Sequence, residues 1–171
     1  MVVTRSPRSY NSQIGVPLSV WLMNEETQVG IFEAGISQPG EMQALRDIIQ
    51  PTIAVLTNLG AAHQENFGSM EEKCRQKMLL FHDAHTMVYD ADDPIVAKMA
   101  AQLDEKGERL YWSATDRQAP MFIKGINKGE AATIIEYVYK QGKSRQYTIP
   151  YIDEASITNS IICMAVCLCM G

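Results

Sequence analysis

The chain has 171 residues, of which 46% are hydrophobic and 20% are charged, and its formal net charge is −5. A chain of this length and composition can bury one sizeable core, so we expect one globular domain. The mild acidity, without a basic run, excludes the electrostatic footprint that nucleic acids or anionic membranes require.

Two short apolar runs closed by glycine lie at residues 28–35 (QVGIFEAG) and 52–60 (TIAVLTNLG). They predict strands that are buried on both faces of a parallel sheet. The segment between them, residues 39–51, has apolar residues near helical spacing and predicts a helix, which makes a βαβ unit. An earlier helix is expected to begin near Pro17.

The alternation of helices and strands continues through the next segments. Residues 69–84 predict a helix, in which Ser69 and Glu72 have the spacing of a capping box. A strand follows at residues 86–93, and a helix with proline in its first turn follows at residues 94–106. This order predicts an α/β fold with a mostly parallel, doubly wound sheet.

The pattern changes near Leu110. Short β-rich segments separated by polar turns fill residues 110–150, and an apolar helix closes the chain at residues 151–171. We therefore expect a parallel α/β part over residues 1–109 with a small antiparallel or mixed β-rich subregion attached to it, within one domain.

Four cysteines are present, without a paired CxxC spacing, and three of them lie in the apolar run IICMAVCLCMG. They are interpreted as reduced core residues. No segment reaches the roughly 20 apolar residues of a membrane span, and the N-terminus lacks the apolar stretch of a signal peptide, so a cytoplasmic protein is expected.

Two side chains of the metal-ligand type follow neighbouring predicted strands. Glu33 lies where the first apolar run ends, and His63 follows the second run. In open α/β sheets the ligand crevice lies at the carboxyl ends of the strands, so both side chains would reach one crevice and could hold a divalent cation. The alternative remains that Glu33 caps a turn and that His63 hydrogen-bonds a backbone carbonyl.

Five motifs occur in a characteristic order: YNSQIGVPLSV, EAGISQPGEM, TNLGAAHQENFGS, QKMLLF and DADDP. In this order they resemble the central ATP-binding domain of the Mur ligases, the ATP-dependent amide-forming enzymes of peptidoglycan synthesis. The resemblance runs from about residue 6 to residue 171. Among the Mur ligases it is greatest to the branch that adds D-alanyl-D-alanine to UDP-N-acetylmuramoyl-tripeptide.

The resemblance implies roles for several residues. It makes Glu33 and His63 magnesium ligands, and it makes Lys77 a lysine that carbon dioxide carbamylates, so that a cation becomes an anion able to help hold magnesium. Lys73 lies one turn earlier on the same helix face. The alternative for either lysine is a solvated helix residue.

Substrate contacts are also implied by the resemblance. Asn11, Ser12 and Gln13 match the loop that faces the muramyl-peptide substrate, although the same residues could form a polar N-cap of the following helix. Asn159 is the candidate nucleotide contact, or else a polar residue in the first turn of the last helix. Two departures from the family pattern are DADD at residues 90–93, where NADD is common, and ASITN at residues 155–159, where HNxxN is common.

The motif GxxxxGK[ST], whose backbone amides cradle phosphates, does not occur in the 171 residues. In the family this motif precedes the point where the sequence begins, and a further domain follows its end. We therefore expect a truncated central domain that is inactive alone. Strand edges near VGIFEAG and IAVLTNL should be exposed and should either self-associate or be covered by the N-terminal residues.

The parent reaction implied by the resemblance uses ATP and Mg²⁺ to activate the peptide carboxylate as an acyl phosphate, which the amine of D-alanyl-D-alanine then attacks. In some bacteria this ligase is fused to alanine racemase, whose own pattern is not visible here. Two alternatives remain open from the sequence: another ligase of the superfamily, similar to folylpolyglutamate synthetase, and a non-catalytic binding module with the same fold.

Overall fold

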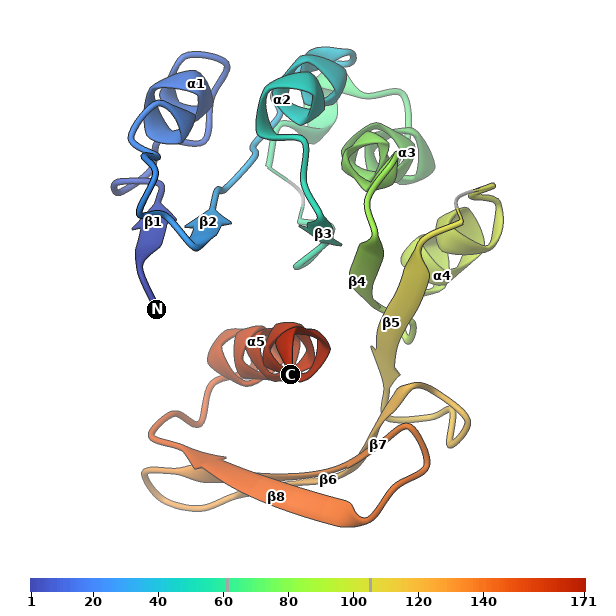
Figure 1. The fold of residues 1–171 in the computed structure, drawn as a ribbon. Helices are drawn as coiled ribbons and strands as arrows, with labels where there is room; N and C mark the ends of the chain where they lie inside the picture. Colours follow the sequence, from blue (N-terminus) through green and yellow to red (C-terminus); the bar gives the residue numbers. More distant parts are fainter. Residues whose placement is uncertain (61, 105) are drawn as a thin grey trace.

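The computed structural model describes residues 1–60, 62–104 and 106–171, and Figure 1 shows its arrangement. The strands are β1 (Val3–Arg5), β2 (Val29–Ile31), β3 (Ile53–Val55), β4 (Thr86–Asp90), β5 (Glu108–Ser113), β6 (Met121–Lys128), β7 (Thr133–Tyr139) and β8 (Ser144–Ile149). The α-helices are α1 (Gly15–Val20), α2 (Glu41–Ile49), α3 (Met70–Met78), α4 (Pro94–Ala101) and α5 (Glu154–Met170), and the short 3₁₀ helices are η1 (Gln64–Asn66) and η2 (Leu79–Phe81).

The strands form two sheets. β1 and β2 pair in parallel, and the second sheet has the order β3-β4-β5-β6-β7-β8. Pairing is parallel from β3 to β6 and antiparallel between β6, β7 and β8. The predicted α/β class with a mostly parallel sheet is confirmed. β5 crosses the 109/110 division expected from the sequence and still pairs in parallel with β4.

Helices cover both faces of the strands. In Figure 1, α1 to α4 lie in a row over one face of β1 to β5, whereas α5 lies on the opposite face. The antiparallel strands β6 to β8 pass beneath α5, so this helix is enclosed between the two parts of the curved second sheet. This arrangement is doubly wound, as the alternating sequence pattern predicts.

The core is divided between these two faces. On one face, α5 contributes Ile157, Ile161, Ile162 and Ala165 to a buried cluster with residues of β4 to β7. On the other, residues of α3, α4 and η2 pack against the buried side of β3 and β4. Fully burying one isoleucine side chain stabilises the fold by about 1.5–3 kcal/mol, so α5 is held mainly by this apolar face.

The predicted starts of α3 and α4 are confirmed. The hydroxyl of Ser69 accepts a 3.0 Å hydrogen bond from the backbone N–H of Glu72, and the Glu72 carboxylate in turn accepts one of 2.8 Å from the N–H of Gly68. Asp93 caps α4 by accepting hydrogen bonds from the N–H groups of Ile95 and Val96. Both helices therefore begin where the sequence pattern places them.

The ends of the elements differ from the sequence prediction. The helix predicted over residues 69–84 ends at Met78, tightens into η2 and stops before Asp83, whose φ of 63° lies in the left-handed region. The helix predicted over residues 94–106 ends at Ala101, and residue 105 lies outside the described residues. Such a left-handed residue cannot continue a helix, and the strand β4 therefore starts three residues after Asp83.

Two predicted features need correction. The strand predicted over residues 28–35 is shorter, since β2 spans only Val29–Ile31, and it pairs with the three-residue strand β1, so N-terminal residues cover one edge of it, which the sequence left open. The assignment of all cysteines to the core is wrong, because Cys163 and Cys167 are exposed although Cys74 is buried. Residues four apart on a helix share a face, so Cys163 and Cys167 lie together on the exposed face of α5.

None of the helices in the described part of the chain combines the length and apolar character needed to cross a membrane.

Candidate functional site

A cavity of about 590 Å³ opens where β2 and β3 run out at their carboxyl ends. This is the place at which open α/β sheets bind their ligands. Six of the seven residues that the sequence singles out line this one cavity, namely Asn11, Ser12, Gln13, Glu33, His63 and Lys77. Residues far apart in the chain are therefore gathered as the strand order requires.

Glu33 is held from the neighbouring loop. Its carboxylate accepts a 2.9 Å hydrogen bond from the side-chain amide of Asn11, and its own N–H donates a 3.3 Å hydrogen bond to the hydroxyl of Ser6. The carbonyl of Asn11 also accepts a 2.8 Å hydrogen bond from the N–H of Gly35. Because a side chain at Gly35 would lie 3.2 Å from the Asn11 amide, this close approach favours glycine.

The other two residues of the Asn11 loop differ in their contacts. Ser12 accepts a 3.2 Å hydrogen bond from the N–H of Gly15, the first residue of α1, whose N-cap position is Ile14. Gln13 donates a 3.1 Å hydrogen bond to the carbonyl of Glu41 and thereby joins this loop to α2. Both side chains also lie on the cavity wall, so these contacts leave them placed where a ligand could reach them.

His63 lies in the loop that connects β3 to α3, directly before η1. It is exposed, and its φ of 57° is left-handed, which is uncommon for a residue other than glycine. Residue 61, two positions before His63, lies outside the described residues. The loop thus presents the imidazole at the mouth of the cavity.

Lys77 and Lys73 lie one helical turn apart on α3 and both reach the cavity. The Lys77 ammonium donates a 3.4 Å hydrogen bond to the carbonyl of Asn58. Burial lowers the pKa of Lys77, and the nearby charge of Lys73 lowers it further, whereas Glu33 acts in the opposite direction. At a given pH, the fraction of molecules in which Lys77 is uncharged is therefore larger than for an ordinary lysine.

Glu41 is a second carboxylate on the cavity wall that the sequence does not single out. It accepts hydrogen bonds of 2.6 Å and 2.9 Å from the backbone N–H groups of Ser37 and Gln38, and these two bonds lower its pKa. An acid in the first turn of a helix after Pro-Gly signals a cap, but the sequence alone does not show that this cap faces a cavity.

Asn159 does not join this group. It lies exposed on α5, on the other side of the sheet from α1 to α4, and outside the cavity wall. The DADD segment has contacts of its own at the ends of β4 and β5. There Asp92 accepts hydrogen bonds from the hydroxyls of Ser113 (2.5 Å) and Thr115 (2.6 Å), so its carboxylate joins the two strand ends.

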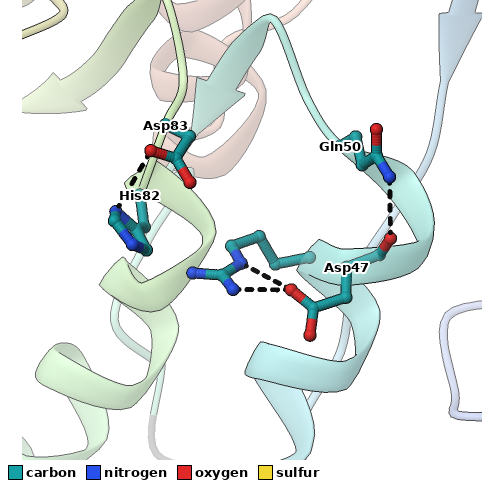
Figure 2. Close-up of polar contacts among 5 residues, drawn as sticks. Asp47, Gln50, His82 and Asp83 are labelled. Carbon is teal, nitrogen blue, oxygen red and sulfur yellow. Dashed lines mark hydrogen bonds and ion pairs between the residues drawn. The ribbon is translucent and has the colours of Figure 1, made fainter.

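A second cavity of about 540 Å³ opens at the opposite, amino ends of β3 and β4. Figure 2 shows its polar groups, in which Arg46 pairs with Asp47 at 2.5 Å and His82 pairs with Asp83 at 3.6 Å. The side chain of Gln50 donates a 3.3 Å hydrogen bond to the carbonyl of Asp47. These contacts join residues close in sequence and stabilise two turns.

The first cavity offers donors that suit magnesium. Mg²⁺ is usually bound by one or two carboxylates together with waters and substrate phosphates, so it does not need a closed protein cage. Glu33 supplies a carboxylate and His63 an imidazole, whereas Lys77 could contribute oxygens only after modification. Within the described residues no three side chains of the His, Cys, Asp and Glu types converge on one point.

Comparisons with known proteins identify the family. The model of the Mur ligase middle domain matches residues 1–167. The UDP-N-acetylmuramoyl-tripeptide–D-alanyl-D-alanine ligase of Bacillus subtilis (strain 168) is 31% identical over 166 residues, which are 95% of this chain and 34% of that protein. The chain therefore spans about a third of the length of this curated relative.

Solved structures share the fold. A crystal structure of MurF from Acinetobacter baumannii matches with a TM-score of 0.85 and 21% identity over 99% of this chain and 36% of that one. The structure of MurF ligase from Thermotoga maritima in complex with ADP matches with a TM-score of 0.78 and 24% identity, over 98% of this chain and 38% of that one. A structure of FPGS from L. casei matches with a lower TM-score of 0.59 and 18% identity, over 81% of this chain and 32% of that one. The chain belongs to the Mur ligase family, through its middle domain.

Proposed function

We propose that this chain is the central domain of an ATP-dependent ligase that joins D-alanyl-D-alanine to UDP-N-acetylmuramoyl-tripeptide. The observation that carries the proposal is the convergence of Glu33, His63 and Lys77 on one cavity at the carboxyl ends of parallel strands. The curated relative from Bacillus subtilis bears the name of this activity. The weaker structural likeness to FPGS gives the alternative ligase less support.

In the proposed reaction, a carboxylate oxygen of the tripeptide attacks the γ-phosphorus of ATP, and ADP leaves. The resulting acyl phosphate is then attacked by the amine of D-alanyl-D-alanine, which forms the amide and releases phosphate and a proton. Phosphoryl transfer is accelerated mainly by positioning and by charge stabilisation. A cavity lined by both cationic and anionic side chains suits both needs.

The side chains of the cavity receive distinct roles. Glu33 and His63 would hold Mg²⁺, which would supply positive charge beside the transferring phosphate. Asn11 keeps the Glu33 carboxylate oriented through its 2.9 Å hydrogen bond. Gln13 and Ser12, on the same wall, would face the muramyl-peptide.

Lys77 would act after carbamylation. Its uncharged amine attacks the carbon of CO₂ and loses a proton, so that a cation is replaced by a carbamate anion. The lowered pKa of Lys77 favours this step, because only the neutral amine is a nucleophile. A role for Asn159 at the nucleotide rests on the family resemblance alone.

The proposal is tested with the full-length parent polypeptide. Release of ADP should require both UDP-N-acetylmuramoyl-tripeptide and D-alanyl-D-alanine, and an amide product of the summed composition should appear in mass spectra. Glutamate in place of the dipeptide, with a folate substrate, is the control for the alternative ligase. The proposal would be overturned if product formed with the folate substrate and glutamate but not with UDP-N-acetylmuramoyl-tripeptide and D-alanyl-D-alanine.

A further inference from the structure

Lys73 is buried to an unusual degree for its residue type. Its exposed fraction is 2%, and it is among the largest side chains that the fold buries completely. Lysine is almost never fully buried unless its charge is compensated, because removing an ammonium from water is costly. The sequence alternative of a solvated helix residue is therefore wrong for Lys73.

The partners of the Lys73 ammonium are backbone oxygens. It donates a 2.6 Å hydrogen bond to the carbonyl of Gly60 and a second hydrogen bond to the carbonyl of Ala62, and it lies 5.8 Å from the centre of the Phe67 ring. Within the described residues, its charge meets these carbonyls and this ring rather than a carboxylate. All three partners belong to one loop, between β3 and α3.

This loop is the one that carries His63. Gly60 and Ala62 precede the histidine, and Phe67 follows it, so the ammonium contacts the chain on both sides of His63. The backbone of His63 is left-handed, which a residue other than glycine adopts only when its surroundings hold it there. The Lys73 side chain enters from the rigid helix α3, which fixes one end of the contact.

We infer that Lys73 is a positioning residue, whose buried ammonium ties the carbonyls of residues 60 and 62 to α3 and thereby sets the position of His63 in the cavity. The inference rests on the proposed function in one respect, since it takes His63 to act in the site. Lys73 would not touch the substrate itself. An apolar side chain could not donate to these two carbonyls, so the link between the loop and α3 would be lost.

A test on the purified chain separates this role from catalysis. Lys73→Met keeps the length and the apolar stem of the side chain but removes the ammonium. Hydrogen exchange at the amides of Asn66 and Phe67, which donate within the loop, should then become about tenfold faster or more, because local opening is easier. Exchange in β4 and α5 should not change.

The chain also contains an internal reference for the histidine. Besides His63 it has only His82 and His85, which line the cavity at the other end of the strands. In imidazole NMR spectra of Lys73→Met, the His63 signal should shift or broaden while the other two stay in place. Lys98→Met is the matched control, because Lys98 is exposed and pairs only loosely with Glu71 at 3.8 Å.

Each outcome either supports or contradicts the positioning role of Lys73. Unchanged loop exchange and an unchanged His63 signal would overturn the inference, even if the proposed ligase activity held. If Lys73→Met unfolds, the native chain still gives a test: its Lys73 ammonium protons should exchange slowly enough to be seen by NMR and should show couplings to the carbonyls of residues 60 and 62. Absence of a protected ammonium signal would contradict the inference. In the parent enzyme, loss of turnover in Lys73→Met with normal loop exchange would likewise speak against positioning.

Discussion

The side-chain amide of Asn11 donates a 2.9 Å hydrogen bond to the carboxylate of Glu33, across 22 positions in the sequence. This contact joins the loop before α1 to the loop after β2 and orients the only carboxylate that the sequence places among the metal ligands. Asn11 could therefore contribute to the proposed site through Glu33 without touching the peptide substrate.

Asn11→Ala in the parent enzyme should raise the Mg²⁺ concentration needed for half-maximal turnover by about tenfold, which lies in the usual range for loss of an outer hydrogen bond to a metal ligand. The fold should remain intact, because this hydrogen bond joins two loops and no helix or strand. An unchanged circular dichroism spectrum would check this. Asn127→Ala, on β6, is the control. An unchanged magnesium dependence would mean that Glu33 does not need this restraint.

Glu33→Ala and His63→Ala should each abolish most metal-dependent turnover in the parent enzyme without unfolding it, since both side chains are exposed. Lys77→Ala should have the same effect, with partial rescue by added acetate, which restores a carboxylate near the lost carbamate. The measurement is phosphate release with and without acetate. Full activity of Lys77→Ala would remove Lys77 from the site, and global unfolding of Glu33→Ala would give Glu33 a structural role instead.

Lys77 should also impose a pH dependence on stability. Burial, followed by the charge of Lys73, lowers its pKa in the folded state. A lysine of this kind opposes folding while it is protonated in the unfolded chain, and the penalty disappears as the pH rises through the unfolded pKa of about 10.4. Lys77→Met should therefore raise the free energy of unfolding near neutral pH, and the gain should shrink as the pH approaches that value.

Urea unfolding of the chain over this pH range measures the effect. Lys98→Met, which removes an exposed lysine, should change the free energy of unfolding by less than about 0.5 kcal/mol at every pH. If the free energy of unfolding gained by Lys77→Met stayed constant with pH, the gain would come from a change in packing or hydration and not from the protonation of Lys77.

Local signals in the sequence located most of the helices. Ser69 and Glu72 mark the start of α3 because the hydrogen bond between them closes within three residues. Glycine-closed apolar runs likewise located β2 and β3, and the order of the strands brought Glu33 and His63 to one cavity. Each of these features depends on neighbours in the chain or on the general rule for parallel sheets.

Features that depend on distant partners were not predictable. The burial of Lys73 follows from two carbonyls that lie 11 and 13 positions earlier in the sequence, and a helical lysine gives no sign of them. Glu41 reads as a helix cap, and only the folded chain shows that it borders the cavity. The length of β2 is limited by its partner β1, a three-residue strand without a distinctive pattern.

The cap of α3 gives a prediction for stability alone. Ser69→Ala should lower the free energy of unfolding by about 1 kcal/mol, because the N–H of Glu72 loses its acceptor at the helix start. The midpoint of urea unfolding should fall while the slope stays the same. Ser9→Ala, an exposed serine in the loop before α1, should leave the midpoint unchanged. If Ser69→Ala and Ser9→Ala were equally stable, water would have replaced the Ser69 hydroxyl as the acceptor for the N–H of Glu72.

The facing edges of β2 and β3 should determine how the isolated chain behaves in solution. Within the described residues, β2 pairs with β1 and β3 pairs with β4, and no hydrogen-bonded pairing joins the two sheets. Figure 1 shows β2 between β1 and β3, so the N-terminal strand occupies the side of β2 that faces away from β3. Residues 3–5 therefore cover one edge of β2, whereas the edges of β2 and β3 that face each other have no hydrogen-bonded partner strand within the described residues.

Unpaired strand edges beside apolar side chains favour pairing with another chain. Ile31, at the end of β2, has an exposed fraction of 58%. We therefore expect two copies of the chain to associate through these edges. The weight-average mass in sedimentation equilibrium should rise with protein concentration. Ile31→Lys should reduce the association, because a charged residue on an edge strand opposes pairing.

Ile134→Lys serves as the matched control, since Ile134 is 38% exposed on β7 and pairs with Asn127 of β6 on one side and Thr148 of β8 on the other. This variant should associate like the unaltered chain. Hydrogen exchange at residues 29–31 and 53–55 should slow as the concentration rises, because association pairs their free N–H groups. A chain that stays monomeric at all concentrations, with both strands strongly protected from exchange, would show that the two edges are satisfied within one molecule and would refute the expected association.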